Sequence, residues 1–265
     1  MNMVYQSEEG RISYNDTGSG FPVVLLHGYL ETALIWESFA SRLSEKFRVI
    51  TPDLPGHGGS SPFGSVHTME LMASVVKDLL HHLGVQRSFI AGHSMGGYVT
   101  LAFADQYPDL LSGFCLFHSQ PFPDAPMAIE KRMREIALVK EGKKEIFIRE
   151  NIARMYASAS ADKFRDMIDR SATIAAGISD EGLIAVLNGM MARPSRLETM
   201  ENGRVPCLWI LGAGDNYIRC GQMRERVKLP SNAELLILEN SGHMGFIEEE
   251  DAALAALTGF AGRLI

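Results

Sequence analysis

A serine stands at the centre of Gly92-His93-Ser94-Met95-Gly96, which matches the pattern Gly-x-Ser-x-Gly. The apolar run Ser88-Phe89-Ile90-Ala91 comes before it, and apolar residues with a helical period follow it. Between a strand and a helix, this pattern forms a turn so sharp that the serine side chain projects from the end of the strand. The two glycines let neighbouring backbone approach where a Cβ would clash. We therefore predict that Ser94 is a nucleophile.

A serine hydroxyl is a weak nucleophile that needs a general base, and the base needs an acid to orient it. His243 follows the last strand-like run, and Asp215 follows the run before it. A loop histidine or an aspartate in a Gly-Asp-Asn turn would be ordinary on its own. All three residues, however, follow strand-like runs, and the carboxyl ends of parallel strands share one edge of a sheet. The pattern predicts that His243 is the base and Asp215 the orienting acid.

Attack on a carbonyl also needs two backbone N–H groups that hold the oxyanion. One is expected from Met95, directly after the nucleophile, and the other from the loop that follows the first long strand. That loop reads His27-Gly28-Tyr29, so the N–H of Tyr29 is our candidate, and its ring would form part of the pocket wall. The candidates for substrate contact are Tyr29, His118, Met190 and Met244. For His118, at a strand end near the nucleophile, a purely structural place is the alternative.

Short apolar runs must form the elements that position these residues. They occupy residues 23–26, 47–50, 88–91, 113–117, 207–211 and 235–238. Continuous apolarity is typical of strands covered on both faces, as in a parallel sheet. Helical patterns lie between the runs, for example from a capping Thr68 to a terminal Gly84. This alternation predicts a doubly wound α/β domain, preceded by an antiparallel edge strand at residues 11–14.

The alternation is interrupted once, between about residues 121 and 196, where only helical patterns occur. We interpret residues 121–196 as a helical cap inserted into a core formed by residues 1–120 and 197–265. Several methionines fall in this stretch, Met190 among them. They either fill a small helical core or line an adaptable apolar pocket, because methionine fits irregular shapes.

Composition describes an ordinary globular enzyme of 265 residues, with 46% hydrophobic and 22% charged residues and a formal charge of −7. There is no basic stripe, so we expect neither a nucleic-acid partner nor membrane association. Three cysteines without a close-spaced pair, Cys115, Cys207 and Cys220, argue against disulfides and a zinc site, and no other residue set suggests a metal. The N-terminus lacks an apolar signal core, so we expect a cytoplasmic protein, of unknown oligomeric state.

The sequence resembles the α/β-hydrolase superfamily over nearly its whole length. The blocks that carry the resemblance are Leu26-His27-Gly28-Tyr29, Asp53-Leu54-Pro55-Gly56-His57-Gly58-Gly59-Ser60, Gly92-His93-Ser94-Met95-Gly96-Gly97, Gly212-Ala213-Gly214-Asp215 and Gly242-His243-Met244-Gly245-Phe246. It is similar to the capped branch that holds esterases, lactonases, carbon–carbon hydrolases and haloperoxidase-like enzymes. The resemblance implies an α/β-hydrolase fold, with a mostly parallel eight-stranded sheet flanked by helices and an inserted helical cap. Some relatives take the acid from the loop that holds Asp124, but Asp215 fills the usual place. His27, His57 and His93 are interpreted as bracing the backbone.

The triad with a cap favours hydrolysis of a small carboxylic ester through an acyl-Ser94 intermediate, without a cofactor. A carbon–carbon hydrolase or lyase with the same triad is an alternative, and it would use cap arginines such as Arg132, Arg134, Arg154 and Arg193 to hold carboxylates. A lactonase would differ only in the shape of its pocket, and a ligand receptor that keeps the triad is a further alternative. Dehalogenases and epoxide hydrolases are disfavoured, because those relatives carry a carboxylate where this chain has Ser94.

Overall fold

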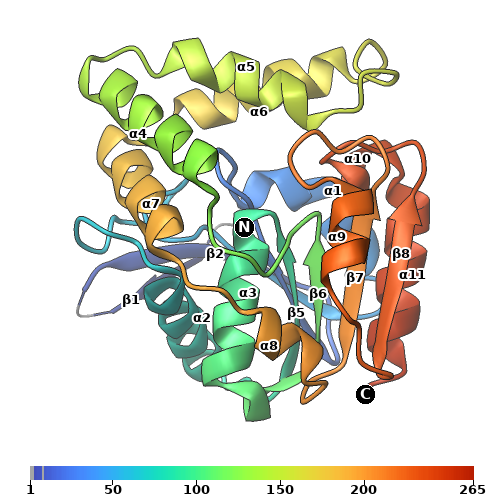
Figure 1. The fold of residues 1–265 in the computed structure, drawn as a ribbon. Coiled ribbons are helices and arrows are strands. Elements are labelled where there is room, and N and C mark those ends of the chain that lie inside the picture. The colour runs from blue at the N-terminus through green and yellow to red at the C-terminus, as the bar shows by residue number, and fades with distance from the viewer. Residues whose placement is uncertain (1–2, 8) are drawn as a thin grey trace.

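The computed structural model describes residues 3–7 and 9–265. Eight strands form one sheet in the order β1-β2-β4-β3-β5-β6-β7-β8, as Figure 1 shows. The strands are β1 (Met3–Gln6), β2 (Arg11–Thr17), β3 (Pro22–Leu26), β4 (Arg48–Pro52), β5 (Ser88–His93), β6 (Leu111–Phe117), β7 (Cys207–Gly212) and β8 (Ala233–Leu238). The pairs β1–β2 and β2–β4 are antiparallel, and the other pairs are parallel. The predicted eight-stranded, mostly parallel sheet is thus confirmed.

The prediction that residues 11–14 form an edge strand is wrong. β2 pairs with β4 on one side and with β1 on the other, so β1 is the edge. β1 has only four residues, and its side chains are exposed or half-buried. It carries no apolar run because it buries no face, and the sequence pattern therefore gave no sign of it.

Helices cover both faces of the sheet, and every residue of β5, β6 and β7 is buried. In Figure 1, α2 (Met69–His82) and α3 (Met95–Gln106) lie in front of the sheet, and α1 (Glu37–Leu43) and α11 (Glu250–Gly262) lie behind it. The shorter helices of the core are η1 (Ala33–Trp36), η2 (Pro108–Leu110), α8 (Leu197–Glu201), α9 (Cys220–Arg226) and α10 (Gly245–Glu248).

Helix α2 begins and ends as its sequence predicts. The Thr68 hydroxyl accepts the backbone N–H of Leu71 at 3.1 Å and caps the first turn. Gly84 adopts a φ of 69°, and the N–H of Val85 reaches back to the carbonyl of Leu80 at 2.9 Å. This is the closing hydrogen bond of a helix that ends in a left-handed residue, a conformation that glycine adopts without strain.

Between β6 and β7 the chain forms α4 (Pro126–Lys140), α5 (Glu145–Met155), α6 (Arg165–Ala176) and α7 (Asp180–Ala192), before α8. Figure 1 shows α4–α7 above the end of the sheet from which the Ser94 turn emerges. Helix α7 rests directly on the loop before α2, since the N–H of His67 donates to the carbonyl of Ala185 at 2.9 Å. A Cβ at Gly189 would clash with the carbonyl of His67, so this approach requires glycine within a helix.

Among the described residues, no single helix is long and apolar enough to cross a membrane. Helices α6 and α7 meet the criteria of length and composition only when taken together, across a bend of 99°.

Candidate active site

Ser94 occupies a strained turn between β5 and α3. Its φ is 50° and its ψ is −111°, a conformation that non-glycine residues adopt only where the surroundings enforce it. Ser94 is held there by its N–H, which donates to the carbonyl of Phe117 at 2.9 Å, and by its carbonyl, which accepts the Ser119 hydroxyl at 2.7 Å. A Cβ at Gly92 would clash with the backbone of Gly96, so the turn closes only with glycine at that position.

His243 and Asp215 lie on the loops that follow β8 and β7. His243 Nδ1 lies 2.7 Å from Asp215 Oδ2, and both side chains are buried. Asp215 Oδ1 accepts the backbone N–H groups of Tyr217 and Ile218, at 2.7 and 2.9 Å. Burial alone would raise the pKa of Asp215, but the attraction to His243 and the hydrogen bonds hold that pKa well below its usual range. The carboxylate is therefore charged and fixed in orientation.

The same pair sets the protonation behaviour of His243. Burial favours the neutral ring and lowers the pKa of His243, but the charge and hydrogen bond of Asp215 outweigh it, so that the pKa is raised. The bond at Nδ1 places a proton there and leaves Nε2 of the neutral ring as an acceptor. The loop itself is held by Glu248, which accepts the N–H of Gly242 at 2.8 Å.

His118, at the end of β6, lies behind Asp215 and is fully buried. Its Nε2 accepts the N–H of Gly245 at 3.1 Å, so the ring proton is on Nδ1, which lies 3.6 Å from Asp215 Oδ2. Burial lowers the pKa of His118 to about 4 and keeps the ring neutral. Nitrogen and oxygen atoms of His118, Asp215 and His243 lie within 4.8 Å of one another, close enough to consider a metal. The bond between His243 and Asp215 already occupies two of those atoms.

A buried pair that we did not predict lies on the other side of His243. Glu31 Oε2 lies 2.9 Å from His93 Nδ1, and His93 Nε2 lies 2.8 Å from the carbonyl oxygen of His243. Each ring nitrogen of His93 thus faces an oxygen atom, Nδ1 that of the Glu31 carboxylate and Nε2 that of the His243 backbone. His93 thus braces the backbone as interpreted from the sequence. Burial raises the pKa of Glu31, but His93 and the N–H of Gly28 outweigh it, and the pKa is lowered.

The loop proposed for the oxyanion lies beside the Ser94 turn. Leu26 of β3 is in register with Gly92 of β5, so the loops that follow these two strands begin at neighbouring positions. A Cβ at Gly96 would clash with the carbonyl of Leu26. Tyr29 follows in this loop and lines the same cavity as Ser94, and Met95 begins α3 directly after Ser94.

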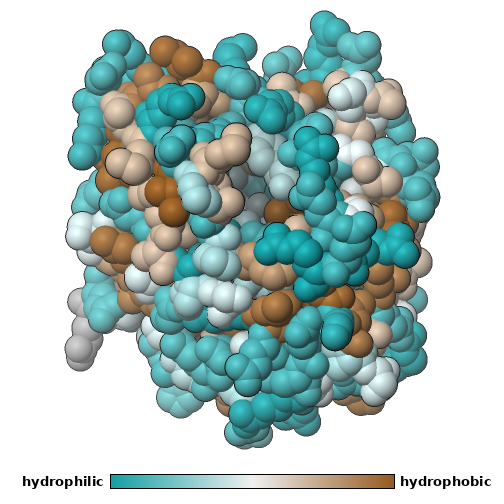
Figure 2. All heavy atoms as spheres, viewed as in Figure 1, coloured by the Kyte–Doolittle hydropathy of each residue, from teal (hydrophilic) through white to brown (hydrophobic). Residues whose placement is uncertain are grey.

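A cavity of about 460 Å³ lies between these loops and helices α4, α5 and α7. Figure 2 shows the surface hollowed near the centre of the same view, with hydrophilic residues on the rim. Of the predicted site residues, Tyr29, Ser94, Met190 and His243 line the cavity. Asp215 lies behind His243, while His118, Met95 and Met244 are fully buried and do not line it.

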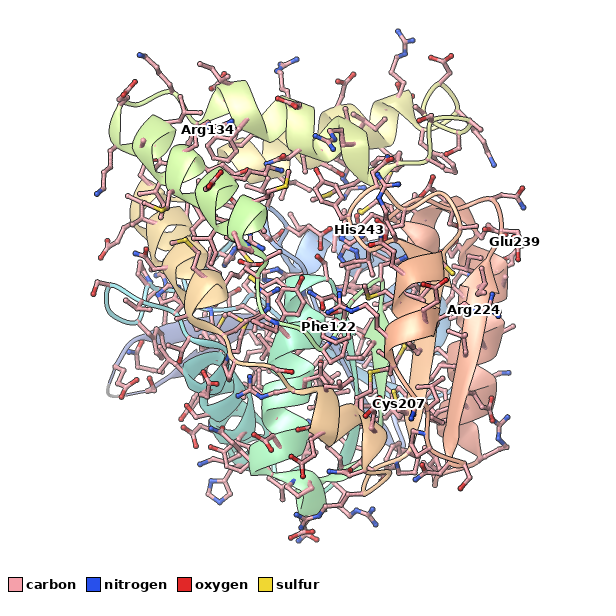
Figure 3. All side chains as sticks on the ribbon, in the orientation of Figure 1. Phe122, Arg134, Cys207, Arg224, Glu239 and His243 are labelled. Carbon is pink, nitrogen blue, oxygen red and sulfur yellow. The ribbon has the colours of Figure 1, made fainter. Side chains whose placement is uncertain are left out.

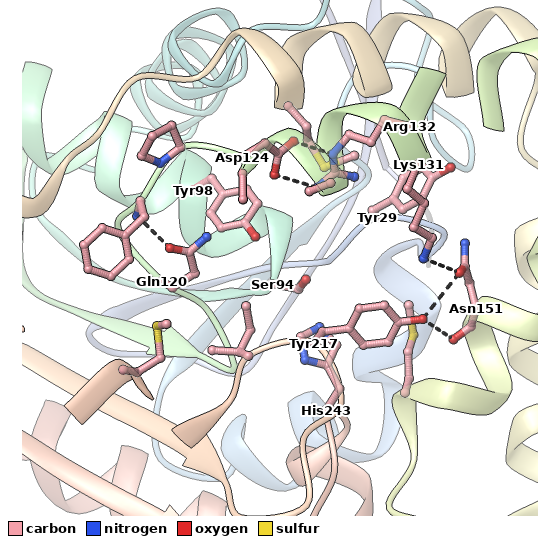
Figure 4. Close-up of a pocket in the computed structure, with 18 of the residues that line it drawn as sticks. Tyr29, Ser94, Tyr98, Gln120, Asp124, Lys131, Arg132, Asn151, Tyr217 and His243 are labelled. Carbon is pink, nitrogen blue, oxygen red and sulfur yellow. Dashed lines mark hydrogen bonds and ion pairs between the residues drawn. The ribbon is translucent and has the colours of Figure 1, made fainter. Parts of the chain in front are cut away.

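Polar residues that we did not predict join the helices to the core at one end of the cavity (Figure 4). Glu135 of α4 accepts the Tyr29 hydroxyl at 3.3 Å and the Asn151 amide at 2.8 Å. Lys131 donates to the Asn151 side chain at 2.7 Å, and the Tyr217 hydroxyl donates to the Asn151 carbonyl at 2.9 Å. Apart from Tyr29, none of these residues lies in a recognisable motif, because helix spacing and tertiary packing bring them together.

Asp124, the alternative acid, does not contact His243. Its carboxylate is bound by Arg132 at 2.5 Å and by Arg193 at 2.8 Å. Burial alone would raise the pKa of Asp124, but these guanidinium groups lower it.

Comparison with known proteins identifies the family of this chain. The model of the α/β-hydrolase fold family matches residues 22–250. A thermophilic esterase from Thermogutta terrifontis, solved with malate bound, is 28% identical and superposes with a TM-score of 0.93, covering 100% of this chain and 99% of that chain. The chain is 26% identical to 2-hydroxy-6-oxononadienedioate/2-hydroxy-6-oxononatrienedioate hydrolase of Paraburkholderia phymatum, over 99% of this chain and 95% of that protein.

Other curated relatives match over a shorter stretch. An uncharacterized protein of Mycobacterium tuberculosis is 36% identical over 106 residues, which is 40% of this chain and 31% of that relative. The chain thus spans about a third of the length of the curated relatives that it matches over this shorter stretch. Because the family model covers most of its residues, the protein belongs to the α/β-hydrolase family.

Proposed function

We propose that this protein is a serine hydrolase that cleaves a small carboxylic ester through an acyl-Ser94 intermediate. The observation that carries the proposal is the shared cavity. Ser94, on its strained turn, and His243, bonded to Asp215 at 2.7 Å, both line it. A nucleophile, a base and an orienting acid therefore meet where a small molecule fits. The likeness to an esterase over the whole chain supports the same reading.

In the first half of the reaction, Ser94 Oγ attacks the ester carbonyl while His243 Nε2 takes the hydroxyl proton. The carbonyl oxygen becomes an oxyanion, which the N–H groups of Tyr29 and Met95 hold. Each such donor lowers the barrier by about 2.7–4 kcal/mol. The carbon–oxygen bond to the alcohol then breaks, and the alcohol leaves with the proton from His243.

In the second half, His243 takes a proton from water, and the resulting hydroxide attacks the acyl carbon. The bond to Ser94 Oγ breaks, Ser94 recovers its proton from His243, and the acid leaves. Asp215 keeps the imidazole in one orientation and stabilises its charged form throughout. We further propose that α4–α7 act as the cap, residues 121–196, over a core of residues 1–120 and 197–265, and that no cofactor takes part.

The test is multiple-turnover hydrolysis of 4-nitrophenyl esters of increasing acyl length, with Ser94→Ala alongside. We expect turnover of the shorter esters after a burst of one equivalent of nitrophenol, and loss of both in the variant. Turnover that persists in a folded Ser94→Ala protein would refute the mechanism.

A second candidate is a carbon–carbon hydrolase with the same triad. It is favoured by the Paraburkholderia relative, whose name gives a dienedioate and a trienedioate as substrates and which matches 99% of this chain. Cleavage of a vinylogous diketo acid, with no hydrolysis of nitrophenyl esters, would select it over the esterase.

A further inference from the structure

One buried carboxylate beside the cavity is shared by two guanidinium groups. Arg132 binds Asp124 through Nε at 2.5 Å and Nη2 at 3.2 Å, and Arg193 Nη1 lies 2.8 Å from the same carboxylate. The side chains are 15%, 4% and 3% exposed for Arg132, Asp124 and Arg193. Two positive charges and one negative charge leave an excess positive charge in a buried place. An unpaired buried charge is costly, so an anion at this position would be stabilised.

The two arginines differ in their hydrogen-bond partners and in whether they line the cavity. Arg193 also donates to the carbonyls of Phe122 and Met190, at 3.2 and 2.8 Å, and its guanidinium stacks on the Tyr98 ring at 3.9 Å. It does not line the cavity. Arg132 does line it and, within the part of the chain that the structure describes, donates only to Asp124. Its Nη1 is thus available to a bound molecule.

A second free cation lies on the same cavity. The Arg226 guanidinium, on α9, stacks on the Phe122 ring at 3.7 Å and lines the cavity. It takes part in no ion pair among residues 3–7 and 9–265. Lys131 and Glu135 also lie on the cavity wall, and their opposite charges balance because Lys131 Nζ lies 3.6 Å from Glu135 Oε1. The excess charge of the lining is therefore positive, in a chain whose formal charge is −7.

We propose that the substrate bears a free carboxylate in addition to its ester, and that Arg132 binds this carboxylate with the help of Arg226. A carboxylate fits the planar donor fork of a guanidinium, and it would balance the excess charge around Asp124. The cavity of about 460 Å³, which has the Ser94 and His243 side chains on its wall, is large enough for a half-ester of a small dicarboxylic acid. This inference rests on the proposed serine-hydrolase function.

The test compares monomethyl glutarate with methyl pentanoate, two methyl esters of equal chain length that differ in the terminal carboxylate. Methanol release, followed by NMR, gives kcat/KM for each ester. We expect the ratio to favour monomethyl glutarate by at least tenfold in the unmodified protein, and Arg132→Gln to reduce it by at least tenfold. Arg132→Lys should keep part of the preference. Asp124 remains paired with Arg193 in both variants, so both should fold.

Arg134→Gln is the matched control, because Arg134 is exposed on the same helix and lies well away from His243 in Figure 3. It removes an equal charge and should leave the ratio within twofold. A wild-type preference for methyl pentanoate, or an equal loss for both esters in Arg132→Gln, would overturn the inference.

Binding to Ser94→Ala separates this inference from the proposed function. Calorimetry should detect monomethyl glutarate, and adding Arg132→Gln should weaken binding at least tenfold. If no ester is hydrolysed but this binding and its dependence on Arg132 remain, the hydrolase proposal fails and the anion site stands. If methyl pentanoate is hydrolysed without any preference for the acid, the hydrolase stands and the anion site fails.

Discussion

Glu31 Oε2 lies 2.9 Å from His93 Nδ1, and the same oxygen accepts the N–H of Gly28 at 2.6 Å. His93 adjoins Ser94 and donates its other N–H to the carbonyl of His243 at 2.8 Å. One carboxylate thus connects the loops after β3, β5 and β8, which carry the proposed oxyanion donor, nucleophile and base. Its position makes Glu31 a positioning residue that touches no substrate.

Glu31→Gln should lower kcat by about 10- to 100-fold, because small displacements of reacting groups are costly, and should leave KM within about threefold. Glu45→Gln, an exposed residue after α1, is the control and should change neither value. Steady-state kinetics with one nitrophenyl ester measures the split. A large rise in KM with unchanged kcat would show that Glu31 shapes the binding pocket instead.

Asp215→Asn should lower kcat by about 10⁴-fold, as expected when a triad histidine loses its orienting acid. The substitution should also move the acid limb of the pH profile of kcat/KM. Asp215 raises the pKa of His243 above the usual histidine value of 6.5, so the limb of the unmodified enzyme lies above that pH and should shift downward in the variant. A pH profile with the same acid limb in both proteins would speak against His243 as the base.

The fold and the proposed triad could be predicted because their signals are local. Ser94 and Asp215 follow the buried strands β5 and β7, and His243 follows the apolar but partly exposed strand β8. Each of the three lies within two residues of a glycine, so a short stretch of sequence marks each position. Helices α4–α7 could be predicted from the apolar period of their residues. The edge strand β1 was not, because it buries no side chain.

The rest of the site depends on contacts between distant residues. Glu31 is buried beside His93, which is 62 residues away in the sequence, and Glu135 contacts Tyr29 across 106 residues. The arginines of residues 121–196 were candidates from sequence, but their surroundings differ. Arg193 stacks on Tyr98 and donates to two backbone carbonyls as well as to Asp124, while Arg132 lines the cavity and donates to Asp124. No pattern within one sequence distinguishes the surroundings of Arg193 from those of Arg132.

Removal of metal ions should leave activity unchanged. Prolonged dialysis against EDTA, followed by kcat measurement in metal-free buffer, should give at least 90% of the starting rate, because the proposed steps use only Ser94, His243 and Asp215. If a metal took part, it would bind to the cluster of His118, Asp215 and His243, whose possible ligand atoms lie within 4.8 Å of one another. Loss of activity that zinc or another divalent ion restores would move the chemistry to that group.

Stability should decrease as pH falls from about 6.5 to about 4. Burial lowers the pKa of His67 and of His118 to about 4, whereas both would titrate near 6.5 in the unfolded chain. Between these values the unfolded chain binds protons that the native protein does not, so the free energy of unfolding decreases with decreasing pH. Urea denaturation at pH 7, 5.5 and 4.5 measures the slope. His67→Gln removes one of these titrations and should flatten that slope, although it loses the bond from the N–H of Phe63 and lowers stability at every pH. The control His82→Gln changes an exposed histidine at the end of α2 and should leave the slope as it is. An equally steep slope in His67→Gln would assign the acid sensitivity to other groups.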